Sequence, residues 1–150
     1  MEQSTTPIYD KIYINGEWVA PGTPEMTDLI NPATGRVSGQ AVRGNAEDVD
    51  RAVKAARGAF TTFSQTIKEE RVRLLKAFAT EYEKRIEDVK KAVTLDIGSP
   101  VSFCNIMHGP AGLVAINNSI EALNHIEYER QQGQSLIVRE PMGVAALISA

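Results

Sequence analysis

Apolar side chains recur at helical spacing after Asn45, and this periodicity constrains the fold more than any other feature. They fall on one face of a helix, at positions i, i+3, i+4, i+7 and i+11: Val49, Ala52, Val53, Ala56 and Phe60. Asn45 is a residue type that caps helices, and Glu47 and Asp48 place negative charge where the helix dipole favours it. The pattern predicts an amphipathic helix over residues 46–60.

Two further helices are predicted downstream. The first begins at about Lys68, carries an apolar stripe opposite a charged face, and meets stop signals at Gly98 and Pro100. The second covers residues 101–128 and contains Gly109-Pro110. Because proline lacks a backbone N–H, we expect the helix to kink or restart there.

Strands are predicted before these helices. Residues 11–19 read as a hairpin around Asn15-Gly16, because this pair tolerates the positive φ values of a type I′ turn. Short strands are expected over residues 26–30 and 36–43. Residues 1–10 are polar and predicted to be frayed.

Strands are predicted after the helices as well. A turn at residues 131–134 leads into a strand over 135–139. The apolar run 143–148 has the composition of a first strand in a buried parallel sheet. The order strands, helices, strands indicates an α/β fold.

Composition excludes several classes of protein. The 150 residues are 43% hydrophobic and 23% charged, with a net charge of -3, so no basic surface for nucleic acid is expected. The longest apolar run, 143–148, is far shorter than the roughly 20 residues that span a bilayer. Met1–Thr6 lacks the charged and apolar regions of a secretory signal, and the single cysteine rules out an internal disulfide. We expect a cytoplasmic protein.

The sequence contains no complete catalytic or metal-binding constellation. Cys104 and His108 share a helix face and His125 follows, but a zinc site needs about four ligands, so no metal is predicted. A buried thiol with two ordinary histidines is the better interpretation, because a mid-helix Cys/His pair is poorly placed for nucleophilic attack. The acidic pairs at 69–70 and 87–88 are interpreted as solvated helix surface.

Six segments, in a common order and spacing, resemble the N-terminal part of the NAD(P)-dependent aldehyde dehydrogenase superfamily. They are I-N-G-E-W-V (14–19), I-N-P-A-T-G (30–35), A-E-D-V-D-R-A-V-x-A-A-R-x-A-F (46–60), E-R-V-R-L-L (70–75), T-L-D-I-G-S-P (94–100) and V-R-E-P-M-G-V-A-A-L-I-S (138–149). The resemblance implies that residues 11–132 belong to a Rossmann-like cofactor-binding domain. Residues 133–142 would begin an oligomerisation arm, and 143–150 would be the truncated first strand of the parallel sheet.

The resemblance also implies an activity and site residues. The family oxidises aldehydes to carboxylic acids with NAD or NADP, here with NAD favoured, through a cysteine thiohemiacetal and thioester. Ile148 and Ser149 would offer backbone to the dinucleotide. Met107 and Ala111 would line the substrate tunnel, with simple core packing as the alternative.

The family's catalytic cysteine has no counterpart here, and Cys104 does not match it. No catalytic residue is therefore predicted, and the 150-residue chain alone is expected to be inactive. The expected partners are an aldehyde substrate and further copies of the chain, as a dimer or tetramer, with no nucleic acid and no membrane. A truncated, non-catalytic structural or oligomerisation module is the alternative function.

Overall fold

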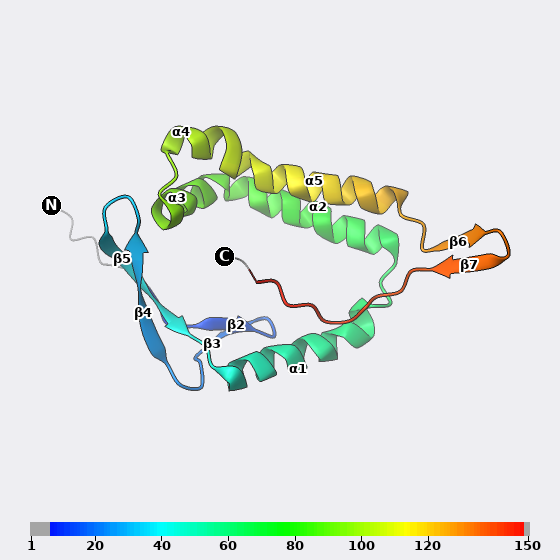
Figure 1. Cartoon of the computed structure of the whole chain (residues 1–150), viewed down its shortest axis with the longest axis horizontal. Helices are drawn as coiled ribbons and strands as arrows, with labels where there is room; N and C mark the ends of the chain where they lie inside the picture. Colours follow the sequence, from blue (N-terminus) through cyan, green and yellow to red (C-terminus); the bar gives the residue numbers. More distant parts are fainter. Residues whose placement is uncertain (1–6, 149–150) are drawn as a thin grey trace.

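A computed structural model describes residues 7–148 of the chain (Figure 1). Small sheets and hairpins flank a set of helices, as expected for an α/β chain. The strands are β1 (Ile8–Tyr9), β2 (Ile12–Ile14), β3 (Glu17–Val19), β4 (Glu25–Asn31), β5 (Arg36–Arg43), β6 (Glu129–Gln132) and β7 (Ser135–Val138). The helices are α1 (Ala46–Phe63), α2 (Lys68–Lys84), α3 (Ile86–Ile97), α4 (Val101–Phe103), the π-helix η1 (Cys104–His108) and α5 (Gly109–His125).

The N-terminal strands form a three-stranded sheet and a separate hairpin. β5 pairs parallel with β1 and antiparallel with β4, and β2 pairs antiparallel with β3. Asn15 and Gly16 have φ values of 54° and 85°, which confirms the predicted turn. Frayed structure over residues 1–10 is a wrong prediction for Ile8 and Tyr9, because their backbone pairs with β5; residues 1–6 lie outside the described residues.

Helix α1 begins as predicted and runs three residues further. The Asn45 side chain accepts a hydrogen bond from the Asp48 N–H at 3.0 Å, and the Asp48 carboxylate accepts one from the Asn45 N–H at 3.0 Å. This reciprocal pair is a capping box, so bonds within residues 45–48 mark the start of the helix.

The single helix predicted from Lys68 is two helices. The chain leaves helical geometry at Arg85, with φ −112° and ψ 10°, and α3 then turns toward η1 and β4. Neither proline nor glycine marks the break, so its cause is tertiary packing and the sequence pattern missed it. Gly98 ends α3 in the left-handed conformation, at φ 69°, which confirms the stop signal.

The interruption expected at Gly109-Pro110 is confirmed. A π-helical turn, η1, precedes Gly109, and the Gly109 N–H donates to the Cys104 carbonyl five residues earlier. Pro110 then occupies the first turn of α5 and has no backbone N–H to donate to the preceding turn.

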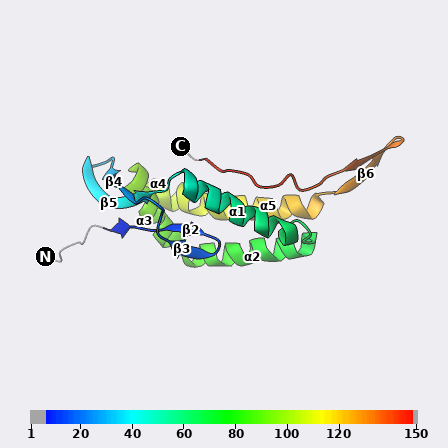
Figure 2. The same ribbon diagram turned by 90° about the horizontal axis from the view of Figure 1, so that it is seen from below.

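The small core lies in the helical layer. α2 packs lengthwise against α5, while α1 lies apart from them beside the β2–β3 hairpin (Figures 1 and 2). Within residues 7–148 the buried apolar side chains are Cys104, Ile116 and Ile120. The chain exposes 11,904 Å², whereas a compact monomer of its mass exposes about 7,500 Å². Many apolar surfaces are therefore uncovered, including Phe78, which is 57% exposed.

The C-terminal part extends away from the helices and returns. β6 and β7 form a hairpin that projects from the end of α5, and the following segment runs back across the molecule (Figure 1). The strand predicted over 143–148 is not formed: the segment has no ladder partner among the described strands, and a strand needs one. None of the described helices combines the length and apolar character needed to cross a membrane.

Candidate functional site

An exposed apolar strip runs over η1 and the start of α5. Met107 is 51% exposed, Ile106 75% and Val114 55%, and Ala111 is exposed between them. Together with Phe103, which is 42% exposed, these residues form an exposed apolar surface over η1 and the start of α5, and we call the five residues the apolar wall. The two predicted tunnel residues, Met107 and Ala111, are thus both exposed in this apolar strip.

The π-helix gives this surface a distinct local geometry. Single π-helical turns inside α-helices occur frequently at functional sites, because they shift the register of the side chains that follow. Met107 lies within η1, and Ala111 lies in the first turn of α5. The wall therefore spans a change of helical register that its sequence signal, Gly109-Pro110, marks only indirectly.

The opposite side of α5 packs against α2 and α3. Ile116 and Ile120 are buried there, and the Tyr82 hydroxyl of α2 donates to the Gly109 carbonyl at 2.9 Å. Gly109 also lies against the Lys90 stem of α3, where an added Cβ would be 2.7 Å from Lys90 Cε. The two glycines that permit this approach, Gly109 and Gly112, were not recognised as packing residues in the sequence, since their partners are distant along the chain.

The predicted cofactor residue Ile148 lies on the C-terminal segment rather than in the helical layer. Leu147 and Ile148 are 94% and 93% exposed. Gly143 has φ 121° and lies against the guanidinium of Arg57 on α1, 3.1 Å from where a Cβ would be. No described strand pairs with this segment, so its backbone groups are available for further hydrogen bonds. Ser149, the second predicted cofactor residue, lies outside the described residues.

Cys104 is a buried structural thiol. It is 1% exposed, its Sγ accepts a hydrogen bond from Thr94 Oγ1 at 3.2 Å, and it faces the Ser99 carbonyl at 3.9 Å. His108 packs edge-on against Phe103, and His125 pairs with Glu121 at 2.8 Å. The three residues are not brought together. Among residues 7–148 no cluster of three metal-ligating side chains occurs.

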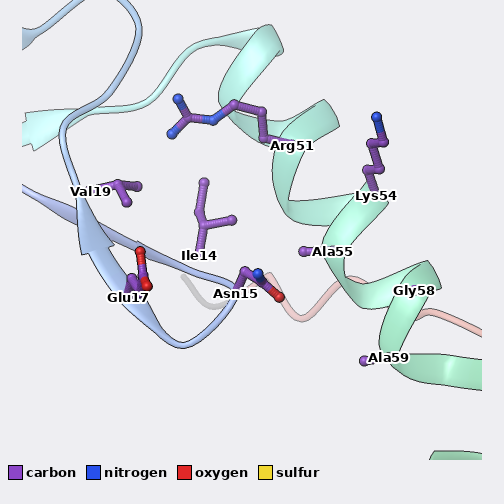
Figure 3. Close-up of a pocket in the computed structure, with 9 residues that line it drawn as sticks. All are labelled: Ile14, Asn15, Glu17, Val19, Arg51, Lys54, Ala55, Gly58 and Ala59. Carbon is purple, nitrogen blue, oxygen red and sulfur yellow. The ribbon is translucent and has the colours of Figure 1, made fainter. Parts of the chain in front are cut away.

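A concave surface separates the β2–β3 hairpin from α1 (Figure 3). It is an open groove of about 590 Å³. In the view Arg51 extends toward the hairpin side and Lys54 away from it. The lining residues are Ile14, Asn15, Glu17, Val19, Arg51, Lys54, Ala55, Gly58 and Ala59. This groove was not predicted from the sequence, although the small residues of α1 are a signal for it.

The buried charge near this groove, Asp48, has a structural role. Asp48 is 3% exposed and accepts hydrogen bonds from the backbone N–H groups of Asn45 and Gly22, the latter at 3.1 Å. The Asn45 N–H lowers the pKa of Asp48 most; burial opposes this, and the Gly22 N–H and the charge of Arg51 lower the pKa further. Asp48 is therefore held ionised as an anchor between α1 and the preceding loop.

Comparison with known proteins identifies the family. The family model described as "Aldehyde dehydrogenase family" matches residues 18–150. The chain belongs to the aldehyde dehydrogenase family. A relative from Staphylococcus aureus (strain bovine RF122 / ET3-1) that carries an aldehyde dehydrogenase name is 41% identical over 141 residues, 94% of this chain. The chain spans about 30% of the length of the curated relatives it matches.

Solved structures of aldehyde dehydrogenases share the fold. Aldehyde dehydrogenase C of Pseudomonas syringae, crystallised as a mutant with NAD+ and octanal, is 32% identical with a TM-score of 0.84. The match covers 94% of this chain and 28% of that one. The Mycobacterium tuberculosis aldehyde dehydrogenase complexed with NAD+ is 29% identical, with a TM-score of 0.82, and the match covers 91% and 30% of the two chains. The family resemblance and the α/β class are confirmed; the roles of Met107, Ala111, Ile148 and Ser149 stay predictions.

Proposed function

We propose that this chain forms part of an NAD-dependent enzyme that oxidises an aldehyde to a carboxylic acid. The observation that carries the proposal is the match of 94% of the chain to a relative crystallised with NAD+ and octanal. In this reaction the aldehyde carbon loses a hydride and water supplies the second carboxylate oxygen. The nucleophilic cysteine, which would carry the thiohemiacetal and thioester, is not among residues 1–150, since Cys104 is buried and engaged.

The apolar wall supports a substrate-binding role for Met107 and Ala111. Half-exposed methionine and neighbouring aliphatic side chains gain free energy when an alkyl chain displaces water from them. Methionine is also flexible enough to adapt to different chain shapes. An aldehyde with an extended apolar tail fits this surface better than a charged one, because the exposed side chains of the wall carry no polar group.

The C-terminal segment supports a cofactor-binding role for Ile148 and Ser149. Leu147 and Ile148 are almost fully exposed, so a dinucleotide can reach this part of the segment. The bound nicotinamide cofactor would supply the hydride acceptor. NAD is favoured over NADP because the matched structures that name a cofactor name NAD+.

The β6–β7 hairpin supports self-association as a dimer or tetramer. All its side chains except that of Ile137 are exposed, and its outer edges have no partner strand among the described residues. Unpaired strand edges favour addition of a strand from another chain. We further place the enzyme in the cytoplasm.

A chimera tests the function without requiring the 150-residue chain to act alone. Residues 18–150 replace the matching segment of the Pseudomonas syringae enzyme, with its cysteine restored, and NADH formation from octanal is measured. We expect octanal-dependent NADH formation by the chimera and none by the 150-residue chain. A folded but inactive chimera would contradict the proposal and favour the non-catalytic module.

A further inference from the structure

We propose that Tyr82 is a positioning residue that sets the preference for aldehyde chain length through the apolar wall. The proposal rests on the proposed function, because it assigns the wall to the substrate. Tyr82 lies on α2 and does not belong to the wall. Its influence passes through Gly109 and Gly112 at the start of α5.

The first step is the contact between Tyr82 and α5. The Tyr82 hydroxyl donates to the Gly109 carbonyl at 2.9 Å, across 27 residues of sequence. The phenol ring lies directly on Gly112, and a Cβ added there would overlap the ring and hydroxyl. A hydrogen bond to a carbonyl fixes both the height and the rotation of that helical turn, because the bond weakens steeply with distance and angle.

The second step is the relation between this contact and the wall. Gly109, Gly112, Ile116 and Ile120 follow at spacings of three and four residues and face α2 and α3. Ala111 is two residues from Gly109, a rotation of about 200° around the helix, so it faces the opposite side. If Tyr82 prevents the helix from rotating at Gly109, it therefore also keeps the wall from rotating.

The helix that carries the wall has irregular backbone hydrogen bonding close to the Tyr82 contact. Met107 lies in a π-helical turn, and Pro110 has no backbone N–H to donate to that preceding turn. The backbone hydrogen bonding from η1 to Pro110 is therefore less regular than that of an ordinary α-helix. The Tyr82 hydroxyl supplies a bond from outside the helix at that point, so its removal should move Met107 and Ala111 more than it moves the middle of α5.

Methyl NMR on the 150-residue chain tests the coupling without any activity. Tyr82→Phe removes the hydroxyl and keeps the ring. We expect the methyl resonances of Met107 and Ala111 to shift while that of Met26, on β4, stays in place. Tyr13→Phe, on the β2–β3 hairpin, is the matched control and should shift neither Met107 nor Ala111. Unchanged Met107 and Ala111 resonances in Tyr82→Phe would overturn the coupling.

Kinetics of the active chimera test the consequence for specificity. One partly buried hydrogen bond corresponds to a factor of about 3 to 10 in an equilibrium constant, so we expect the KM for octanal to change by about that factor. The kcat, and the KM for acetaldehyde, whose two-carbon chain offers little apolar surface to the wall, should stay at the parental values. Tyr13→Phe should leave all of these constants unchanged.

The outcomes separate the two proposals. Equal changes in KM for both aldehydes, or a parallel loss of kcat, would show a general structural role and overturn the specificity proposal. An inactive parent chimera would overturn the proposed function and, with it, the assignment of the wall to substrate. The methyl shifts would still decide whether Tyr82 positions the wall.

Discussion

Helices α1 and α5 are nearly equal in length but are held by different interactions. α1 has a capping box at Asn45 and Asp48, yet Val49 and Val53 on its apolar face are 61% and 45% exposed. α5 has no side-chain cap, yet Ile116 and Ile120 are buried against α2. One helix depends on local bonds at its first turn, and the other depends on tertiary packing.

This difference shows which helix has its apolar face packed within residues 7–148. Most helical stability in proteins comes from packing of an apolar face rather than from propensity. α5 has that packing within the described residues, whereas the packing of α1 is confined largely to the β2–β3 hairpin. The capping box therefore contributes more to the stability of α1 than a cap would to that of α5. Loss of an apolar side chain should destabilise α5 more than α1, and loss of the cap should destabilise α1 more than α5.

The largest expected effect is loss of the α2–α5 core. Ile120→Ala should lower the free energy of unfolding by about 2–4 kcal/mol, because it removes buried methyl groups and leaves a cavity. Val53→Ala, on the exposed face of α1, is the control and should change stability by less than about 0.5 kcal/mol. Urea denaturation measures both. Equal losses would mean that α1 is packed as tightly as α5.

Glycine-to-alanine substitutions should have opposite signs in the two helices. Gly112→Ala forces a Cβ against Tyr82 and should cost about 1–3 kcal/mol, as overpacking does. Gly58→Ala in α1 meets no atom within 4 Å and should stabilise the chain by about 0.5–1 kcal/mol, because alanine is the better helix former. Thermal unfolding of both variants checks the signs, and a stabilising Gly112→Ala would contradict the packing of Tyr82.

Structural features with a local cause were predicted correctly from the sequence. The Asn15-Gly16 turn, the Asn45 cap and the Gly98 stop depend on backbone preferences of a few neighbouring residues. The break at Arg85 depends on how α3 packs against distant elements, so no local pattern marked it. The segment 143–148 has the composition of a strand, but a strand also needs a partner strand. Local composition does not show whether that partner is present.

The candidate site was predictable only in part, for the same reason. Met107 and Ala111 were named from the family resemblance; both are exposed, and their role stays a prediction. The contact of Tyr82 with Gly109 joins residues 27 positions apart, and nothing in the local sequence of either residue signals it. Only the folded structure shows which residues of α2 and α5 pack together.

Removal of the α1 cap should produce a smaller, localised effect. Asn45→Ala loses the bond to the Asp48 N–H and the 2.5 Å contact with Thr23 Oγ1, and should cost about 1 kcal/mol. Hydrogen exchange should accelerate in the first turns of α1 and stay unchanged in α5. Asn118→Ala, exposed within α5, is the matched control. Faster exchange throughout both helices would show that the two are one cooperative unit.

The smallest effect expected is a pH dependence at the same end of α1. The pKa of Asp48 is lowered in the folded chain, chiefly by the Asn45 N–H, so ionised Asp48 stabilises the fold above the ordinary value of about 4. This contribution should decline as the pH falls below about 4 toward the lower folded value. Urea titrations across this range should show a shallower pH dependence for Asp48→Asn than for the parent. The Lys84 hydrogen bond also lowers the pKa of Glu81, but its side chain is 62% exposed, so solvent screening should make the change in Glu81→Gln smaller. If Glu81→Gln flattened the profile more than Asp48→Asn, the charged cap would not be what ties α1 to the preceding loop.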